Sequence, residues 1–521
     1  MEPIGRVIEE STPFGFLFKT SIDRPVALHD YVFVEVSEPR EEHTEKVKVL
    51  AEVLGLGAKN PLATERLATE QQAIPYSYKL VRAEVLGYID ENGRILRPKV
   101  APDPNAPVYR AEDSLLQAYF KGLEAGLPIR LGKLLNRPNV TVPVHLQDLQ
   151  FHLGVFAQTR SGKSYLAGRF IEEILLNTPF PVIVIDIHAD YVMMDQRIKS
   201  KEKHGDFNVV VYYPPGTPKV SGVTAEQRDL NLSPDQLTNE ELTALLGATL
   251  GELQQIILRN ILKKLRADKK PFGLKDIMAV IQQKLDETDE EGKPVLKAKE
   301  RTRYESLRLR LEDLGEEVSL PPAGMSITDL VRPKTLSVIC LNGLRSRIQD
   351  AYTSIIIDLI FRHIVATKGD EQNFIPAFLF VEEAHRVASR EGGSRYAVKT
   401  ISTAIREGAK FGLFLALISQ RPRSIDPDIL SNVGNYAVLR ITNQQDQSMI
   451  ESASESFSHR LVEDLPSLNQ GEAVLVGPFV PLPAHIRTLD RRTTHYGVTP
   501  DLKGIMNRIN ARLEKREKAR W

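Results

Sequence analysis

The sequence predicts an α/β protein in which a sheet core with a helical insertion is preceded by a small β-barrel. Three observations predict this class. Short β-rich runs fill residues 4–100, a strand, a short loop and a helix follow one another over 151–171, and residues 233–315 change to helical spacing. The chain of 521 residues is also too long for one ordinary domain, so two or more are expected.

The N-terminal region is expected to form the barrel, because several short strands come before any long helix. Alternating or β-rich runs occupy 31–36, 46–50 and 79–86, and polar turns such as 91–94 separate some of the strands. A more helical piece at about 60–73 interrupts this β pattern.

Three prolines between 101 and 107 predict a linker, because proline fits poorly in a sheet ladder or a helix interior. A short helix at 114–120 then leads into the core. We expect a barrel over 1–100, a linker and approach to the core over 101–150, a first core part over 151–232, a helical insertion over 233–320, a second core part over 321–490, and a C-terminal segment and helix over 491–521.

The loop at 157–164 ends in Ser-Gly-Lys-Ser and has the form of a P-loop. An apolar strand at 151–156 precedes it and helical spacing follows, in the order that this motif requires. Loop N–H groups and the helix N-terminus attract phosphate, Lys163 adds a charge, and Ser164 offers a hydroxyl to Mg²⁺. A chance match in a solvated loop is the alternative. The residues expected to contact ATP are Thr159, Arg160, Ser161, Gly162, Lys163, Ser164 and Tyr165.

Acidic residues end two apolar strands farther along the chain. Asp186 follows a run of four β-branched residues, at the strand end where open α/β sheets place their chemistry. Glu382 and Glu383 follow the strand at 377–381 in a Walker B arrangement. Glu382 would then be the acid linked to the metal, although aspartate is commoner there, and Glu383 would orient and deprotonate the attacking water. The alternative is that these strands simply end in solvated acids.

A further apolar strand at 413–419 ends in Gln420, which can touch the γ-phosphate or the water if this strand lies beside the P-loop strand.

In the insertion, 233–236 and 238–241 both have the form of a capping box. Basic residues of the insertion could line a nucleic-acid path, but interleaved acids favour a solvated face. Near the C-terminus Ile505, Ile509 and Leu513 form one apolar stripe on an otherwise basic helix.

Composition excludes several protein classes. Lys+Arg equals Asp+Glu, so binding to nucleic acid cannot be argued from overall charge. The only cysteine, Cys340, lies in an apolar run and is expected to be a buried thiol, and a chain without a disulfide framework fits a reducing cytoplasm. The N-terminus has no apolar signal region, and the apolar stretch 355–364 is interrupted by charges and too short to span a bilayer. We therefore expect a cytoplasmic protein without a membrane partner.

Taken together, the motifs at 157–164, 184–191, 381–386, 406–412 and 418–422 resemble the HerA group of the HerA/FtsK hexameric ATPases. The ordered set is more specific than any one motif. Residues 151–497 carry this resemblance, and residues 1–100 look like the β-barrel that precedes the ATPase in that group. The resemblance implies a RecA-like P-loop NTPase core.

The resemblance also implies roles for single residues. Lys163 and Ser164 would bind phosphate and Mg²⁺. Glu383 would be the catalytic acid, Asp186 a further acid of the site, Gln420 the sensor, and Arg406 the arginine that reaches the nucleotide of the neighbouring subunit. The segment 492–497, with His495 and Tyr496, resembles the part of the chain that folds near the nucleotide in this group.

The sequence departs from the family pattern at three places. Ala157 replaces the first glycine of the P-loop pattern, which is tolerable only where φ need not be positive. Arg160 stands where relatives usually have glycine, which can strain the loop or place another cation near the phosphates. Ala189-Asp190 replaces the usual Gly-Glu, which we expect to be a mild change. Lys163 and Glu383 are kept, so ATP hydrolysis is expected.

The resulting hypothesis is a homohexameric DNA translocase, driven by ATP, that moves double-stranded DNA through a central channel and works with a partner nuclease of the NurA type in processing DNA ends. Loops at 197–204 and 389–395 are candidates for the channel, and an ordinary surface loop is the alternative for each. A second hypothesis keeps the motor but gives it another effector, in defence against phage. A third is an ATP-gated scaffold that moves no DNA.

Overall fold

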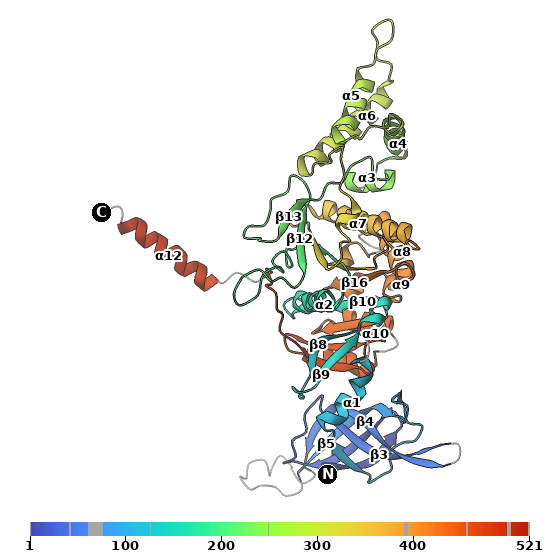
Figure 1. Cartoon of the computed structure of the whole chain (residues 1–521), viewed down its shortest axis with the longest axis vertical. Helices are drawn as coiled ribbons and strands as arrows, with labels where there is room; N and C mark the ends of the chain where they lie inside the picture. The colour runs from blue at the N-terminus through green and yellow to red at the C-terminus, as the bar shows by residue number, and fades with distance from the viewer. Residues whose placement is uncertain are drawn as a thin grey trace.

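Three regions follow one another along the long axis of the molecule (Figure 1): a β-barrel, a large mixed sheet covered by helices, and a helical arm. This computed structural model describes residues 2–40, 43–60, 77–124, 127–247, 250–389, 394–454, 457–497 and 502–518. The predicted fold class, a barrel followed by an α/β RecA-like core with a helical insertion, is confirmed.

The barrel is a closed ring of six antiparallel strands in the order β2-β1-β7-β3-β4-β5, and the pairing of β5 with β2 closes it. Its strands are β1 (Gly5–Thr12), β2 (Gly15–Ser21), β3 (Tyr31–Pro39), β4 (Thr44–Lys59), β5 (Tyr78–Ile89) and β7 (Pro107–Arg110), and the short β6 (Ile95–Leu96) extends β5. Side chains such as Phe18, Val34 and Val81 fill the interior and have no exposed surface. The predicted strands are confirmed, whereas the helical piece predicted at about 60–73 lies outside the described residues from 61 onward.

The proline-rich segment differs from the predicted linker, because its last residues form β7 and close the barrel between β1 and β3. Pro107 is the first residue of β7, a position where the missing N–H of proline is tolerated. Beyond the helix α1 (Asp113–Glu124), which agrees with the prediction at 114–120, β8 (Pro128–Leu134) and β9 (Thr141–His145) form one edge of the core sheet. Much of 107–150 is therefore built into the two sheets.

The core sheet has twelve strands in the order β13-β12-β14-β11-β15-β16-β10-β17-β18-β19-β8-β9. The strands from β13 to β17 are parallel, and β18, β19, β8 and β9 continue the sheet as antiparallel neighbours. The remaining bounds are β10 (Leu153–Phe156), β11 (Val182–Asp186), β12 (Asn208–Tyr213), β13 (Glu226–Asp229), β14 (Thr335–Cys340), β15 (Ala377–Val381), β16 (Leu413–Ser419), β17 (Asn435–Leu439), β18 (Glu472–Val476) and β19 (Ala484–Thr488).

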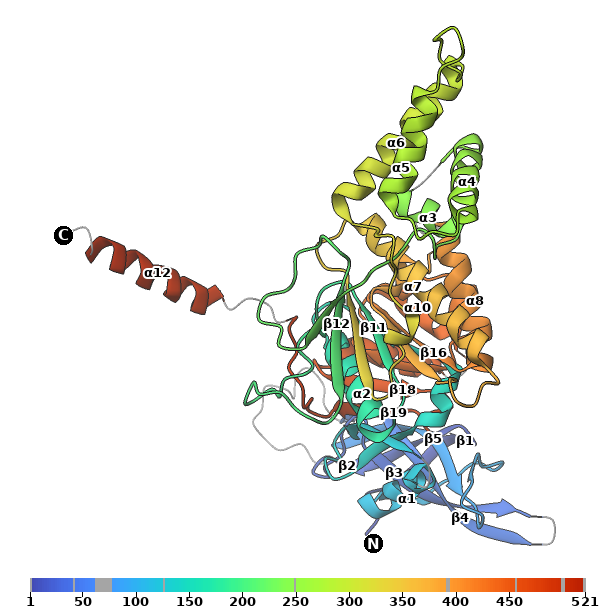
Figure 2. The same ribbon diagram turned by 45° about the horizontal axis from the view of Figure 1, so that its top comes forward.

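The parallel strands are buried on both faces, as their continuous apolar runs predict. In β11, Ile183 and Ile185 pack on one face while Val182 and Val184 pack on the other. The helix α2 (Lys163–Asn177) covers the second face, and α7 (Ser346–Thr367) and α8 (Arg395–Phe411) cover the first (Figure 2). The helix α1 packs against the edge strand β9. Shorter helices complete the core: α9 (Pro427–Leu430), α10 (Gln444–Ala453), α11 (His459–Asp464) and 3₁₀ turns at Leu146–Phe151, Ile327–Asp329, Ala384–Arg386, Pro422–Ser424 and Leu465–Ser467.

The predicted helical insertion forms the arm. It consists of α3 (Asn239–Leu246), α4 (Glu252–Ala267), α5 (Leu274–Asp286) and α6 (Ala298–Glu317). Thr238 caps α3 in a capping box with Glu241, as predicted, whereas the pattern at 233–236 forms a turn and starts no helix. The hydroxyl of Ser233 donates instead to the carbonyl oxygen of Pro322 at 2.8 Å, which ties the start of the insertion to its end.

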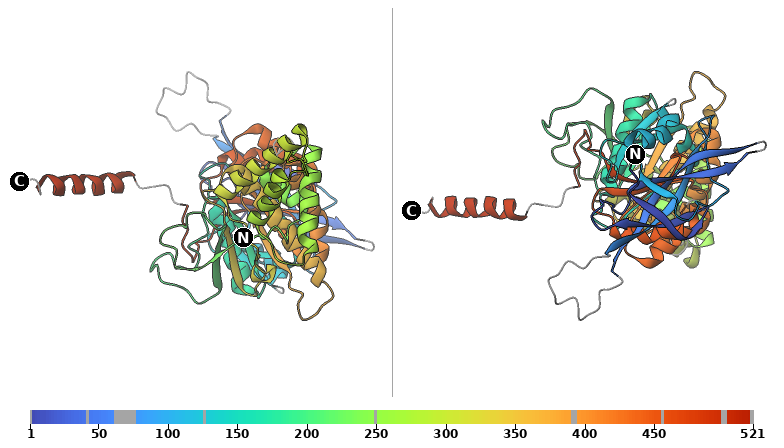
Figure 3. Two further views of the ribbon diagram at one scale, coloured as in Figure 1. Left: turned by 90° about the horizontal axis from the view of Figure 1, so that it is seen from above. Right: turned by 90° about the horizontal axis from the view of Figure 1, so that it is seen from below.

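The C-terminal helix α12 (Leu502–Lys518) extends away from the body of the molecule (Figures 1 and 3). Leu502, Met506 and Ile509 are at least half exposed on it, and the Leu513 side chain of the predicted stripe lies outside the described residues. Among the described helices, none combines the length and the hydropathy that crossing a membrane requires.

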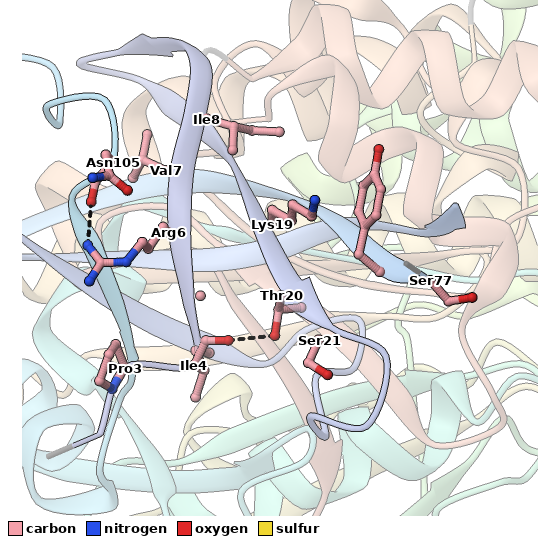
Figure 4. Close-up of a pocket in the computed structure, with 12 residues that line it drawn as sticks. Pro3, Ile4, Arg6, Val7, Ile8, Lys19, Thr20, Ser21, Ser77 and Asn105 are labelled. Atoms are coloured by element: carbon pink, nitrogen blue, oxygen red, sulfur yellow. Dashed lines mark hydrogen bonds between the residues drawn. The ribbon is translucent and has the colours of Figure 1, made fainter. Parts of the chain in front are cut away.

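A cleft of about 880 Å³ lies on the barrel, where the start of the chain crosses β2 (Figure 4). Arg6 donates to the carbonyl oxygen of Asn105 at 2.9 Å, and Thr20 donates to that of Ile4 at 2.5 Å. No residue of the loop at 157–164 lines this cleft, so it is separate from the phosphate-binding motif.

Candidate nucleotide site

The chemistry-bearing motifs meet at one edge of the sheet because their strands are neighbours. The parallel strands β11, β15, β16 and β10 lie side by side in that order, so their carboxyl ends line up. Asp186 ends β11, Glu382 and Glu383 follow β15, and Gln420 follows β16. Gln420 therefore stands beside the P-loop strand, as its proposed contact with the nucleotide requires.

The P-loop contains one strained residue. Gly162 has φ of 103° just before α2, and Arg160 has φ of 66°, where an L-residue other than glycine costs roughly 1–2 kcal/mol. Ala157 is not among the described residues with positive φ, so the first departure from the motif is tolerated and the second is a source of strain. Backbone bonds tie the loop to its neighbours: the N–H of Gln158 donates to the carbonyl oxygen of Arg440 at 2.9 Å, the N–H of Gly471 donates to that of Ser161 at 3.1 Å, and the N–H of Ala157 donates to that of Ser419 at 3.3 Å.

Lys163 joins the P-loop to the Walker B acids. Its Nζ lies 3.0 Å from Glu382 Oε2 and 2.9 Å from Glu383 Oε1, and all three residues are at least nine-tenths buried. Burial lowers the pKa of Lys163, but the two carboxylates outweigh burial and raise it, so the lysine stays charged. A phosphate that enters this site meets a cation whose present partners are carboxylates.

Glu383 is held by several partners in a strained conformation. Its φ of 48° and ψ of 43° lie in the left-handed region, which non-glycine residues seldom adopt outside functional sites. Gln420 Nε2 donates to Glu383 Oε1 at 2.7 Å, and Thr159 Oγ1 donates to Gln420 Oε1 at 2.6 Å. His385 Nδ1 lies 3.3 Å from Glu383 Oε2. Burial raises the pKa of Glu383, but Lys163 and these hydrogen bonds lower it overall, so the acid is a carboxylate that can accept a proton.

Tyr191 is a site residue that sequence reasoning missed. Its hydroxyl donates to Glu382 Oε1 at 2.5 Å, and its side chain has no exposed surface. Burial and the nearby Glu382 raise the pKa of Tyr191, so the phenol keeps its proton and remains a donor. Only the position of Tyr191, five residues after the strand end at Asp186, could have suggested this contact.

Asp186 shapes the loop after β11. Its two carboxylate oxygens accept the backbone N–H groups of Asp190 at 3.0 Å and Tyr191 at 2.9 Å, and so position Tyr191 against Glu382. Burial, with the Asp190 charge, raises the pKa of Asp186 to about 8. Ala189 in the same loop has φ of 65°, so the change from glycine costs more than the mild effect that we expected from the sequence.

Arg406 forms its hydrogen bonds within its own helix. It lies exposed on α8, and its guanidinium donates to the carbonyl oxygen and hydroxyl of Ser402 in the same helix, at 3.2 and 2.8 Å. In the part of the chain that the structure describes, no arginine forms a hydrogen bond or ion pair with Lys163, Glu382 or Glu383.

The C-terminal segment with His495 and Tyr496 packs beside the P-loop helix. Glu172 in α2 accepts the backbone N–H groups of residues 492 and 493, and Tyr165 OH accepts that of Arg491 at 2.8 Å. The N–H of Tyr496 donates to the carbonyl oxygen of Asp190 at 3.2 Å. The segment therefore joins the first turn of α2 to the loop after β11, although whether His495 and Tyr496 contact the nucleotide stays a prediction.

The oxygen donors at this edge fit magnesium, which prefers hydroxyl, carboxylate and phosphate oxygens. Ser164 lies in the first turn of α2 and Glu382 directly follows β15, so these two residues would supply a hydroxyl and a carboxylate to the ion. Cys340 takes no part: it is buried in β14, and burial raises the pKa of its thiol to about 12.

The two candidate channel loops have different outcomes. The loop at 197–204 folds on itself and pairs with the C-terminal segment, because Arg197 forms a β-bridge with Thr493 and Ile198 N donates to the carbonyl oxygen of Arg492. In the loop at 389–395, residues 390–393 lie outside the described part of the chain. Contact with DNA stays a prediction for both.

Comparison with known proteins adds an independent line of evidence. Residues 129–360 match the family model described as the central domain of the helicase HerA. The chain is 27% identical to the DNA double-strand break repair helicase HerA of Pyrococcus furiosus over 446 residues, 77% of this chain and 76% of that protein. It is 26% identical to the protein of the same name from Saccharolobus solfataricus over 534 residues, 97% of this chain and 96% of that protein. The plasmid coupling protein TrwB in complex with ADP and Mg²⁺ has a TM-score of 0.48 and 15% identity, over 68% of this chain and 88% of that chain.

Proposed function

Because this chain is an ATPase of the HerA family, we propose that hydrolysis at its sheet edge drives double-stranded DNA through the centre of a homohexamer. The premise rests on the family match and on relatives whose names describe a DNA double-strand break repair helicase. The proposal adds the ring, the channel and the coupling to DNA. The loops at 197–204 and 389–395 are our candidates for the surfaces that pull on DNA phosphates.

The arrangement of side chains supports the following hydrolytic step. Lys163 releases the carboxylates of Glu382 and Glu383 and binds phosphate oxygens of ATP. Glu383 accepts a proton from a water whose oxygen forms a bond to the γ-phosphorus, while the bond from that phosphorus to the bridging oxygen of ADP breaks. Gln420, hydrogen-bonded to Glu383, orients the water or the γ-phosphate. Mg²⁺, which Ser164 and Glu382 would hold, neutralises phosphate charge when bound.

The observation that carries the proposal is that Arg406 is exposed and that its hydrogen bonds to described residues stay within its own helix. A cation on the transferring phosphoryl group is worth about 10³–10⁵ in rate in other NTPases. Within the described residues, the acids and lysine of this site have no arginine partner, while Arg406 lies exposed with only its own helix as partner. An arginine placed in this way can serve the site of a neighbouring subunit, and such sharing requires a ring.

We further propose a partner nuclease of the NurA type, encoded separately, with the barrel as its docking platform. The barrel is closed and therefore leaves no free strand edge inside its ring of six strands, so a partner would bind its side-chain surface.

We also propose that the protein acts in the cytoplasm, because a single buried thiol fits a reducing compartment.

The test is the ATPase rate of the assembled protein with and without long duplex DNA, with Glu383→Gln as the control for contaminating hydrolases. We expect DNA to stimulate the wild-type rate and to leave the Glu383→Gln background unchanged. A wild-type rate that DNA does not change in an assembled ring would refute translocation and favour the scaffold.

A further inference from the structure

A second cluster of titratable side chains lies where the barrel meets the ATPase core. His29 precedes β3 and Glu52 lies in β4, both in the barrel, while Asp464 ends α11 and His485 lies in β19, both in the core. His29 is 7% exposed, Glu52 1% and His485 0%. The ATP site described above uses none of them, so their burial needs a separate explanation.

The two imidazoles are stacked and face one carboxylate. Their centroids lie 3.9 Å apart with the rings inclined by 30°. Nδ1 of His29 lies 3.2 Å, and Nδ1 of His485 lies 2.7 Å, from the same Oε1 of Glu52. The Nε2 atoms, which lie across each ring from Nδ1, are therefore left for another partner.

Ordinary hydrogen bonding does not satisfy this cluster. His485 Nε2 and Asp464 Oδ2 are buried and have no hydrogen-bond partner among the residues that the structure describes, and the short contact of His485 Nδ1 with Glu52 is not aligned as a hydrogen bond. Polar atoms buried in this way each cost about 1–3 kcal/mol, so native proteins usually satisfy them. Pairing Glu52 with charged imidazoles would still leave these two atoms unsatisfied.

Potential ligand atoms of three of these side chains lie close together. One ligand atom from each of His29, Asp464 and His485 lies within 4.8 Å of the others, as three ligands of one metal ion must. Two imidazole nitrogens and a carboxylate oxygen are a donor set that suits Zn²⁺ and related transition metals better than Mg²⁺ or Ca²⁺. A carboxylate that holds the far nitrogen of each ligating imidazole is the usual support of such a site.

We propose that His29, His485 and Asp464 bind a divalent transition-metal ion of the Zn²⁺ class, with Glu52 as the positioning carboxylate for both imidazoles. A cleft of about 250 Å³ reaches Asp464 between the barrel strands and α11, and provides a route for the ion.

The position of this site gives the ion a structural role. His29 belongs to the barrel, whereas Asp464 and His485 belong to the ATPase core, so one ion joins the two regions. Because metal binding to the folded protein is linked to its stability, the ion should raise the stability of the whole chain. The proposal is independent of ATP hydrolysis, because the nucleotide motifs follow β10, β11, β15 and β16, whereas His485 lies in β19.

The test measures zinc bound to the full-length, tag-free protein after incubation with Zn²⁺ and desalting, with affinity determined by competition against a chromogenic chelator. We expect the wild type to retain one zinc ion per chain, and thermal unfolding to move to higher temperature with Zn²⁺. Asp464→Asn and His485→Gln should lose this tight binding, and Glu52→Gln should weaken it by about 10–100-fold.

The matched control is His459→Gln, which removes an imidazole that is 71% exposed at the other end of α11, the helix that Asp464 ends. This variant should bind zinc as the wild type does. If His485→Gln does not fold, Asp464→Asn still tests the zinc site, because it removes a ligand without removing a buried ring. A wild type that retains no zinc, or an Asp464→Asn variant that binds it with wild-type affinity, would overturn the proposal.

Discussion

The sheet edge and the barrel–core junction both bury charged side chains, but they satisfy them differently. At the sheet edge Lys163 is shared between Glu382 and Glu383, and the acids accept further hydrogen bonds from Tyr191 and Gln420. At the junction, buried atoms of Asp464 and His485 have no such bonds to any described part of the chain. A ligand at the sheet edge must compete with hydrogen bonds that the side chains already make to one another. A ligand at the junction would instead bind polar atoms that lack a partner.

Backbone strain does not separate the two regions. Arg160, Ala189 and Glu383 have positive φ at the sheet edge, and His29 has φ of 60° at the junction. Such conformations persist where the surrounding structure holds them in place and are commonest at functional sites. What distinguishes the regions is therefore the state of their polar atoms, and this difference can be tested by substitution.

The largest effect is expected from Lys163→Ala. The variant loses the charge that binds phosphate and leaves Glu382 and Glu383 facing each other without a cation. We expect ATP binding and hydrolysis to be abolished, as measured by equilibrium binding of a fluorescent ATP analogue and by phosphate release. Zinc retention at the junction should not change; a joint loss of both would show that the two regions are not independent.

Glu383→Gln should separate binding from chemistry. Glutamine keeps the shape of the side chain but cannot take the proton of the attacking water, so hydrolysis should fall by about 10²–10⁴-fold while ATP stays bound. Single-turnover phosphate release and retention of labelled ATP on a filter measure the two parts. Turnover near the wild-type rate would assign the base to another residue.

Tyr191→Phe should have an intermediate effect. It removes the donor to Glu382 and costs about 1–3 kcal/mol for a buried acceptor left with one partner fewer. We expect a lower unfolding temperature and a kcat reduced by less than in Glu383→Gln. The control is Tyr436→Phe, which removes another buried hydroxyl, one that donates to the carbonyl oxygen of Leu430 and not to the acids. Equal kcat values for the two variants would mean that Tyr191 contributes only to stability.

The smallest effect is expected from Ala189→Gly. Glycine relieves the left-handed strain of roughly 1–2 kcal/mol but loses about 0.5–1 kcal/mol in unfolded-chain entropy, so a small net rise in stability follows. Thermal unfolding compares it with Ala351→Gly, in the middle of α7, which should instead be destabilised. A lower stability for Ala189→Gly would mean that the positive φ of Ala189 does not destabilise the folded protein.

Local patterns predicted most of the fold and the candidate site. The P-loop and the acids after β15 are motifs that each span only a few consecutive residues. The strands before them are recognisable in the sequence as continuous apolar runs. The closing strand β7 was hidden, because its first residue is a proline in a stretch that otherwise suggests a linker. Capping was decided by tertiary context: the pattern at Thr238 starts a helix, and the similar pattern at Ser233 does not.

Contacts between distant parts of the chain could not be predicted. Tyr191 reaches Glu382 across 191 residues, and Glu172 in α2 accepts N–H groups from residues 492 and 493. The junction brings His29 and His485 together from opposite ends of the sequence. No spacing rule links such residues, because the order of strands in the two sheets sets their distance.

The measurement that tests the central claim most directly is ATP hydrolysis by assembled Arg406→Ala, with duplex DNA present and Lys399→Ala, an exposed lysine on the same helix, as control. A guanidinium that serves the neighbouring site predicts a loss of about 10³–10⁵-fold in kcat with ATP binding intact, and a Lys399→Ala rate like the wild type. Hydrolysis at the wild-type rate by the Arg406→Ala ring would contradict the account.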